Sequence, residues 1–352
     1  MPSKSSPFFT SRIFFIAALT LNVCLAAYPL QANEAAKDPS PEQQECTRIG
    51  NKLGSVSIHD CLALKLADSG ARSVKDQAIL LKEYPPLLDK RQPVGRVLLI
   101  GGTHGDEYAA VSIVFKWMKI LKKYHSGMFH WHVVPLLNPD GLLLHSPAQR
   151  VNANGVDLNR NMPTNDWYHE TATYWKSIGN DPRHYPGSKP LSEPESRWLY
   201  EEIKHFKPDT IITVHAPFGL LDFDGPQPGP SKIGYLNFKS IGVYPGSLGN
   251  CAGTQHSIPV ITIELPRAGT MPTDKQISGM WVDLVRWMRY NIPNKATVKA
   301  YATFDKTTQT MMSSTPLGRA ASAPAQPSSI QKINSATVKP LQLQVDNQAI
   351  HE

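Results

Sequence analysis

Apolar and amphipathic segments alternate along the middle of the chain. Runs of apolar residues predict strands over residues 78–82, 96–101, 131–137, 209–214 and 260–265. The last two runs are uninterrupted and rich in β-branched residues, which is typical of strands buried on both faces of a sheet. Segments with a helical pattern predict helices over residues 60–66, 108–122, 193–206 and 274–291. The alternation of strands and helices predicts an α/β domain.

Two of these helices carry additional signals in the sequence. Ser192 is the expected N-cap of the third helix, with Glu195 as its capping-box partner, and that helix is expected to run to Phe206. The last helix carries apolar residues at helical spacing, and we expect these to face the core: Ile277, Trp281, Leu284, Val285 and Met288.

The first residues of the chain have the order of a targeting signal. Lys4 and Arg12 precede an apolar run over residues 13–30, and the small residue Ala32 follows that run. This order predicts a cleaved secretory signal peptide over residues 1–32. The mature protein is then periplasmic or secreted, without stable membrane insertion. Because the run approaches the length of a membrane span, a retained anchor is the alternative.

The remaining segments are assigned by composition. Residues 33–45 are polar and contain proline, so we expect a flexible leader. Residues 46–92 are expected to form a small N-terminal element packed on a main catalytic domain over residues 93–293. Residues 294–352 are rich in Thr, Ser, Ala, Pro and Gln, which predicts a disordered tail because they carry too little apolar surface to fold.

The cysteines fit an exported protein. Cys46 and Cys61 bracket a short segment, which predicts a disulfide between them in an oxidising compartment. Cys251 is then unpaired, and its neighbours indicate a buried residue without a nucleophilic role.

Composition and charge narrow the class of protein. Hydrophobic residues make up 41% of the 352 residues and charged residues 18%, as expected of a chain that buries a sizeable core. The formal net charge is +7, and it falls to +5 if Lys4 and Arg12 leave with the signal peptide. We expect no nucleic-acid partner, because arginine-rich runs interleaved with aromatic residues are absent from the sequence. The mild positive excess is either a solvated surface or a weak attraction to an anionic cell envelope.

Candidate metal ligands follow two of the predicted strands. His104 and Glu107 lie three residues apart where the strand over 96–101 gives way to a helix, and His215 follows the strand over 209–214. Ligands bind at the carboxyl ends of strands in open α/β sheets. A catalytic zinc site uses three protein ligands and keeps one position open. The sequence therefore predicts a shared zinc site.

Other polar residues follow the same pattern and suggest hydrolysis. Glu264 ends the strand over 260–265, where a carboxylate can take a proton from water and return it to a leaving amine. The polar loop over residues 150–161 contains Arg150 and Arg160. One arginine beside a metal can stabilise an oxyanion, and the other can bind a substrate carboxylate through two hydrogen bonds.

Together these residues resemble a known family, the M14 zinc carboxypeptidases, and within it the bacterial murein peptide amidase branch. The resemblance covers about residues 96–291 and rests on five sequence segments: His104-Gly105-Asp106-Glu107, Asn138-Pro139-Asp140-Gly141, Arg150 with Gly155-Val156-Asp157-Leu158-Asn159-Arg160-Asn161, His215, and Ile261-Thr262-Ile263-Glu264-Leu265-Pro266. It implies a three-layer sandwich with a mixed, mostly parallel central sheet flanked by helices.

The same resemblance implies roles for individual residues. One zinc ion is bound by His104, Glu107 and His215, while Glu264 acts as general base and acid. Arg150 stabilises the oxyanion, and Asn159 and Arg160 bind the substrate carboxylate.

The resemblance also implies a substrate, a cell-wall muropeptide cleaved between γ-D-glutamate and diaminopimelate. Asp222 and Asp224 are either turn residues or contacts for the amine of this substrate. Tyr244 is expected to bind substrate, because it lies near the position where related carboxypeptidases often place a mobile tyrosine over the scissile bond. The neighbouring Pro245 stiffens the segment and leaves its catalytic role open.

Two other functions fit parts of this pattern. One is a deacylase similar to aspartoacylase or succinylglutamate desuccinylase, which share the ligand pattern; the export signal and Glu264-Leu265-Pro266 favour the peptidase. The other is a non-catalytic envelope protein that binds peptides. The sequence carries no signal for the oligomeric state.

Overall fold

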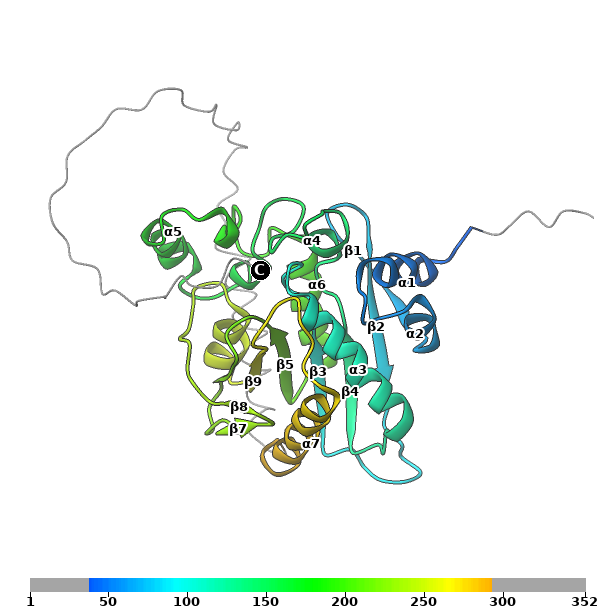
Figure 1. Ribbon diagram of the computed structural model, residues 1–352. Coiled ribbons are helices and arrows are strands. Elements are labelled where there is room, and N and C mark those ends of the chain that lie inside the picture. Colours follow the sequence, from blue (N-terminus) through cyan, green and yellow to red (C-terminus); the bar gives the residue numbers. More distant parts are fainter. Residues whose placement is uncertain (1–37, 293–352) are drawn as a thin grey trace, which may run out of the picture.

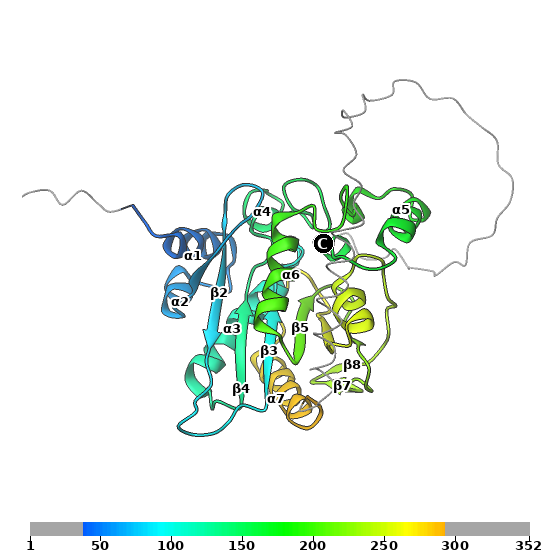
Figure 2. The ribbon, with the colours of Figure 1, turned by 180° about the vertical axis from the view of Figure 1, so that it is seen from behind.

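A seven-stranded sheet covered by helices on both faces dominates the computed structural model, which describes residues 38–292 (Figures 1 and 2). Its strands are β1 (Ala67–Arg72), β2 (Ala78–Tyr84), β3 (Gly95–Ile100), β4 (Phe129–Val134), β5 (Thr210–His215), β6 (Leu220–Asp224) and β9 (Val260–Glu264). A small second sheet consists of β7 (Lys232–Ile233) and β8 (Leu236–Asn237).

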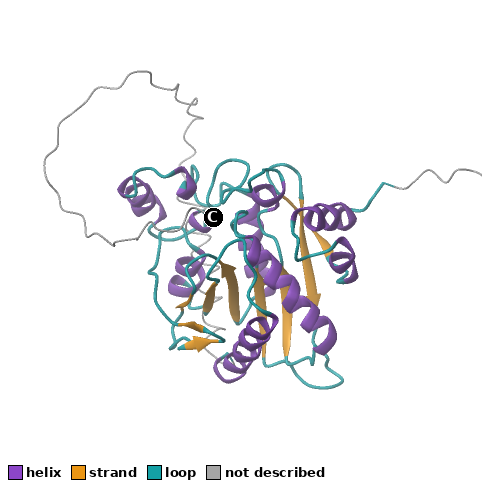
Figure 3. Cartoon of the chain, in the orientation of Figure 1, coloured by secondary structure: helices purple, strands orange, loops and turns teal. Residues whose placement is uncertain are grey.

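Helices account for most of the remaining regular structure (Figure 3). The α-helices are α1 (Pro41–Lys52), α2 (Ile58–Ala63), α3 (Tyr108–Tyr124), α4 (Pro139–Leu143), α5 (Trp167–Ser177), α6 (Pro194–Phe206) and α7 (Asp274–Asn291). Three further turns of helix are the 3₁₀ segments Leu158–Arg160 and Pro182–His184 and the π-helical segment Gly249–Gln255.

The central sheet is mixed, with a parallel centre. Its strand order is β1-β2-β4-β3-β5-β9-β6, and the four middle strands run parallel to one another. The strands β1 and β2 on one side and β6 on the other pair antiparallel. Because the middle strands are parallel, their carboxyl ends lie at one edge of the sheet.

Both faces of the sheet are buried, because alternate residues of the middle strands point into different clusters. Val97 and Leu99 of β3 pack in a core with α3 and α7, whereas Leu98 and Ile100 pack in a second core with α6. The views agree, since α3 and α7 lie in front of the sheet in Figure 1 and α6 lies in front in Figure 2. The three-layer α/β sandwich expected from the sequence is confirmed. In α7 the buried residues match the prediction except that Met280 is buried and Val285 only half-buried.

The N-terminal region is more integrated than the sequence predicted. Strand β2 pairs with β4, so residues 46–92 extend the central sheet and are not a separate element packed on it. The expected leader over 33–45 is also wrong in part, because α1 begins at Pro41. There Ser40 and Gln43 form a capping box. The predicted Cys46–Cys61 disulfide is present and joins α1 to α2, and Cys251 is buried and unpaired.

The start of α6 also differs from the prediction, although its end at Phe206 agrees. The N-cap position is Glu193, without a side-chain cap, and not Ser192. The Ser192 hydroxyl is already used, because it accepts a hydrogen bond from Asn161 Nδ2 and donates one to the Glu193 carboxylate. Glu195 is buried and accepts hydrogen bonds from Asn152 Nδ2 and the backbone of Val74.

Strands β1 and β6 were not predicted, and both lie at the edges of the sheet. The predicted signal peptide, the first part of the predicted leader and the predicted C-terminal tail lie outside the described residues. Within residues 38–292, the structure contains no helix that is long and apolar enough to cross a membrane.

Candidate active site

The predicted ligands come together at the carboxyl edge of the parallel strands. His104 and Glu107 follow β3 on the loop that leads into α3, and His215 is the last residue of β5. This loop packs closely on α4. A Cβ atom at Gly105 would lie 2.2 Å from the carbonyl carbon of Gly141, so only glycine allows the backbones to approach in this way.

The three side chains present their ligand atoms to one point. His104 Nδ1 lies 2.8 Å from Glu107 Oε1 and 3.1 Å from His215 Nδ1, and His215 Nδ1 lies 3.1 Å from Glu107 Oε2. Ligands of a tetrahedral zinc ion with bonds of ~2.0–2.1 Å are separated by about 3.3 Å. All three residues are buried. The donor set and its spacing therefore fit zinc.

The Nε2 atom of each imidazole contacts a further hydrogen-bonding group. His104 Nε2 lies 3.1 Å from Asp157 Oδ1, and His215 Nε2 lies 2.9 Å from the Thr213 hydroxyl. An ionised carboxylate only accepts, so Asp157 fixes the hydrogen of His104 on Nε2 and leaves the Nδ1 lone pair for a metal. Although burial alone would raise the pKa of Asp157, Arg150 and His104 lower it well below its usual value.

Glu264 lies beside this cluster. It is directly opposite His215 in the pairing of β5 with β9, and its side chain lines the same cavity. Burial raises the pKa of Glu264 above its usual value, partly offset by His215. Its Oε2 atom is buried and has no hydrogen-bond partner in the structure. A buried carboxylate with a free oxygen is poised to accept a proton.

Arg150 occupies the side of the cavity near Asp157. Its Nε and Nη2 atoms donate to Asp157 Oδ2 at 3.1 and 3.0 Å, and Nη1 lies 3.5 Å from Glu107 Oε1. The guanidinium is thus fixed beside the cluster. Asp157 holds both Arg150 and His104, and sequence reasoning assigned it no role although it lies in the motif.

A second cationic group, that of Arg160, also lines the cavity. The Arg160 guanidinium lies 4.5 Å from the centre of the Tyr244 ring and 5.6 Å from that of Tyr174 on α5. Its Nε atom is buried without a partner, and Nη1 donates to the carbonyl of Asn159. The Asn159 side-chain oxygen accepts from the backbone of Leu248, which fixes the orientation of its amide.

Tyr244 is placed in the cavity wall beside Arg160. Its hydroxyl donates to the carbonyl of Ile241 at 2.9 Å. The ring thus contacts the guanidinium with its face, and its hydroxyl is engaged by the neighbouring backbone.

Asp222 and Asp224 belong to a strand, so the interpretation as turn residues is wrong. Both lie on β6, which pairs with β9, and both line the cavity. Burial raises the pKa of Asp222, and burial together with Asp222 raises that of Asp224 to about 7. The Asp222 Oδ1 atom is buried without a hydrogen-bond partner.

The cavity that joins these groups has a volume of about 370 Å³, within the range of small-molecule and peptide sites. The His-Glu-His cluster and Glu264 line it. Arg160, Tyr244 and the two aspartates of β6 line it as well. The cavity therefore offers partners to both a substrate carboxylate and a substrate amine.

Comparisons with known proteins agree with this geometry. Residues 40–218 match the family model described as zinc carboxypeptidase, Peptidase_M14. The murein peptide amidase A of Escherichia coli K12 is 32% identical over 203 residues, which are 54% of this chain and 79% of the relative. Its counterpart in Vibrio campbellii is 31% identical over 183 residues, 49% of this chain and 69% of that protein.

Among solved structures, the murein-tripeptide amidase of Escherichia coli O157 aligns with 62% of this chain and 90% of its own, at 26% identity and a TM-score of 0.44. Glu264 lies beyond the segment matched by the family model, so its place beside the cluster is a result of the structure. On the family match over half its length and the identity to curated relatives, the chain belongs to the M14 zinc carboxypeptidase family and is a zinc-dependent hydrolase.

Proposed function

We propose that this enzyme hydrolyses the amide bond between γ-D-glutamate and diaminopimelate in cell-wall muropeptides, with one zinc ion held by His104, Glu107 and His215. The observation that carries the proposal is the cavity itself. It places a buried carboxylate with one unpartnered oxygen, that of Glu264, beside the His-Glu-His cluster, and arginines and two aspartates line the same cavity. The curated relatives named murein peptide amidase A support the substrate class.

The proposal gives Glu264, Arg150 and Asp157 separate chemical tasks. A bound zinc ion supplies Lewis-acid chemistry that polarises the carbonyl and acidifies a water molecule. Glu264 accepts a proton from the attacking water and delivers it to the leaving amine. Arg150 donates hydrogen bonds to the oxygen on which negative charge develops, and Asp157 holds its guanidinium in place.

Substrate recognition in this proposal follows from the charged groups that line the cavity. The diaminopimelate side of the scissile bond carries a free carboxylate, which suits Arg160 and the amide of Asn159. A guanidinium binds a carboxylate through parallel hydrogen bonds, and the Tyr244 ring contacts its face. Diaminopimelate also carries a free amine, and Asp222 presents an unpartnered oxygen for it.

Export to the cell envelope fits the same function. The N-terminal residues have the order of a cleaved secretory signal, and the Cys46–Cys61 disulfide is typical of an oxidising compartment. We infer that the enzyme acts in the periplasm or outside the cell, where muropeptides are produced by turnover of the wall.

The direct test incubates purified mature protein with defined muropeptides and follows the products by mass spectrometry. We expect cleavage between γ-D-glutamate and diaminopimelate, lost on chelation and in Glu264→Gln and unchanged in Glu201→Gln, a control on the outer part of α6. Amidation of the carboxylate next to the scissile bond should lower kcat/KM by about 10- to 100-fold, because one charge-assisted interaction is lost.

Two results would overturn the proposal. If the enzyme hydrolyses acyl amino acids and leaves muropeptides uncleaved, it is a deacylase. Tight zinc binding without hydrolysis of any peptide would identify a binding protein.

A further inference from the structure

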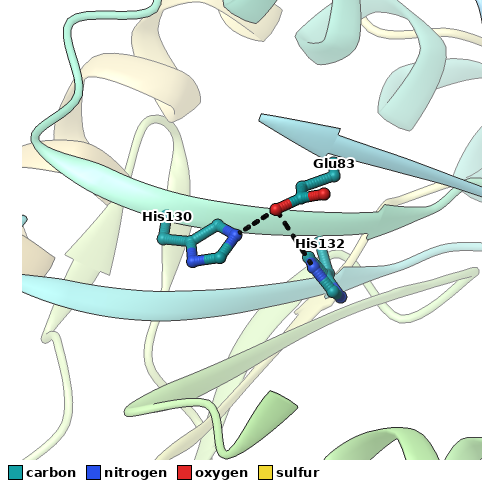
Figure 4. A group of neighbouring side chains, drawn as sticks. All are labelled: Glu83, His130 and His132. Atoms are coloured by element: carbon teal, nitrogen blue, oxygen red, sulfur yellow. Dashed lines mark hydrogen bonds and ion pairs between the residues drawn. The ribbon is translucent and has the colours of Figure 1, made fainter. Parts of the chain in front are cut away.

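A second group of two histidines and one glutamate lies away from the cavity (Figure 4). Glu83 belongs to β2, and His130 and His132 belong to β4. Glu83 is directly opposite His132 in the antiparallel pairing of these strands. His130 and His132 are two residues apart on a strand, so they project from the same face. The three side chains therefore converge from two strands.

The atoms of this group are close enough to share one ion after a small adjustment. His130 Nε2 lies 2.8 Å from Glu83 Oε1, and His132 Nε2 lies 4.0 Å from the same oxygen. One ligand atom from each residue lies within 4.8 Å of the others. Ligands of a tetrahedral zinc ion are about 3.3 Å apart. The Glu83 side chain is 51% exposed and the two imidazoles are partly exposed, so all three side chains have room to adjust around an ion.

Helix α6 holds one imidazole in the orientation that metal binding requires. Glu202 Oε1 lies 2.5 Å from His132 Nδ1, and the Phe206 ring stacks on the His132 ring at 3.7 Å between centres. A carboxylate at Nδ1 places the hydrogen there and leaves a lone pair on Nε2, which faces Glu83. The same arrangement of carboxylate, histidine and metal recurs in protein zinc sites.

The neighbouring charges are one cation, which opposes a metal ion at His130, and two carboxylates, which favour it. Arg96 of β3 lies opposite His130 in the sheet, but its guanidinium is paired with Asp209 at 3.9 Å. Two carboxylates, from Glu83 and Glu202, face the two imidazoles.

We propose that Glu83, His130 and His132 bind a second divalent transition-metal ion of the zinc class, which fastens β2 to β4. The exposed side of Glu83 leaves room for water as a further ligand. The ion joins the N-terminal part of the chain to the parallel centre of the sheet. Its site lies near the beginning of β4, so it is separate from the carboxyl edge that carries the active site.

The test counts zinc bound to the full mature chain by equilibrium dialysis and elemental analysis. We expect two zinc ions per chain for the wild type and one for His130→Ala, with muropeptide hydrolysis and circular dichroism unchanged. Glu202→Gln should keep both ions but weaken the second by about 10- to 100-fold. The matched control Glu201→Gln, whose carboxylate pairs with Lys204, should leave both affinities unchanged.

Two results of this test would contradict the proposal. One zinc ion in the wild type at saturating zinc would show that the group is an ordinary ion pair between strands. Two ions in a folded His130→Ala variant would place the second ion elsewhere. Nitrogen-15 NMR of the histidines adds a readout that is independent of stability, because zinc should shift Nε2 of His130 and His132 while Nδ1 of His132 stays protonated.

Discussion

Two histidines and one glutamate come together at two places in one sheet, and the surroundings of the two groups differ. His104, Glu107 and His215 are buried at the carboxyl edge of the parallel strands, beside a further carboxylate and a cavity. His130 and His132 are partly exposed and Glu83 is half-exposed on the pair of β2 and β4.

This contrast shows what a metal site needs before it becomes catalytic. Ligand chemistry is common to both groups. The buried group adds the carboxylate of Glu264, which we propose as the base, an anchored cation in Arg150 and a cavity that can hold a substrate. The exposed group adds contacts from α6 that fix an imidazole, which suits a structural ion.

The largest effect is expected at the base. Glu264→Gln keeps the size and position of the side chain but removes the proton acceptor. The value of kcat should therefore fall by about 10²- to 10⁴-fold while the active-site zinc is retained. Steady-state kinetics with parallel zinc analysis measures both. The matched change Glu83→Gln should leave kcat unchanged, and an equal loss in both variants would break the contrast between the two groups.

A smaller but still large effect is expected at Arg150. Arg150→Met removes the hydrogen-bond donors beside the cluster, so kcat should fall by about 10²- to 10³-fold with little change in KM. Single-turnover and steady-state kinetics distinguish this from a binding defect. A rise in KM alone would place Arg150 in substrate binding and not in stabilisation of the oxyanion.

The next effect concerns the group behind a ligand. Asp157→Asn keeps the shape but removes the charge that faces His104 Nε2 and Arg150, so the affinity for zinc should weaken by about 10- to 100-fold. Competition with a chromophoric chelator measures the affinity. If Asp157→Asn binds zinc as tightly as the wild type, the carboxylate does not tune the site.

The smallest effect concerns stability and pH. The pKa of Asp224 is raised to about 7 by burial and by Asp222, whereas an unfolded aspartate has a pKa of ~3.9. The folded state then binds more protons between these values, so this group's contribution to the free energy of unfolding falls as pH rises from about 4 to 7. Asp224→Asn should therefore be more stable than the wild type by about 1–2 kcal/mol at pH 8 and little different at pH 4. Urea denaturation at both pH values measures this difference, and an equal effect at pH 4 and pH 8 would contradict it.

Much of this architecture can be predicted from the sequence. Continuous apolar runs predict the buried middle strands, and His215 and Glu264 lie at the ends of two of these runs. Because the carboxyl ends of parallel strands lie at one edge of the sheet, the two residues come together there. The helix over Asp274–Asn291 carries apolar residues at helical spacing and has the predicted limits. These features depend on the local order of residues and on the rule that parallel strands end at the same edge of a sheet.

Other features depend on contacts across space and were missed. Strand β1 is polar because it lies at an edge, and β6 carries two aspartates that locally resemble a turn. Ser192 failed as an N-cap because Asn161, 31 residues away, uses its hydroxyl. The group around Glu83 joins residues 47 positions apart, and it became visible only through the pairing of β2 with β4.

The most direct test of the catalytic centre is a crystal structure of the zinc-loaded enzyme with anomalous data at the zinc absorption edge. A strong peak is predicted at bonding distance from His104 Nδ1, Glu107 and His215 Nδ1, with Glu264 nearby but not bonded to the ion. A fully active enzyme whose zinc lies away from these three residues would contradict the account.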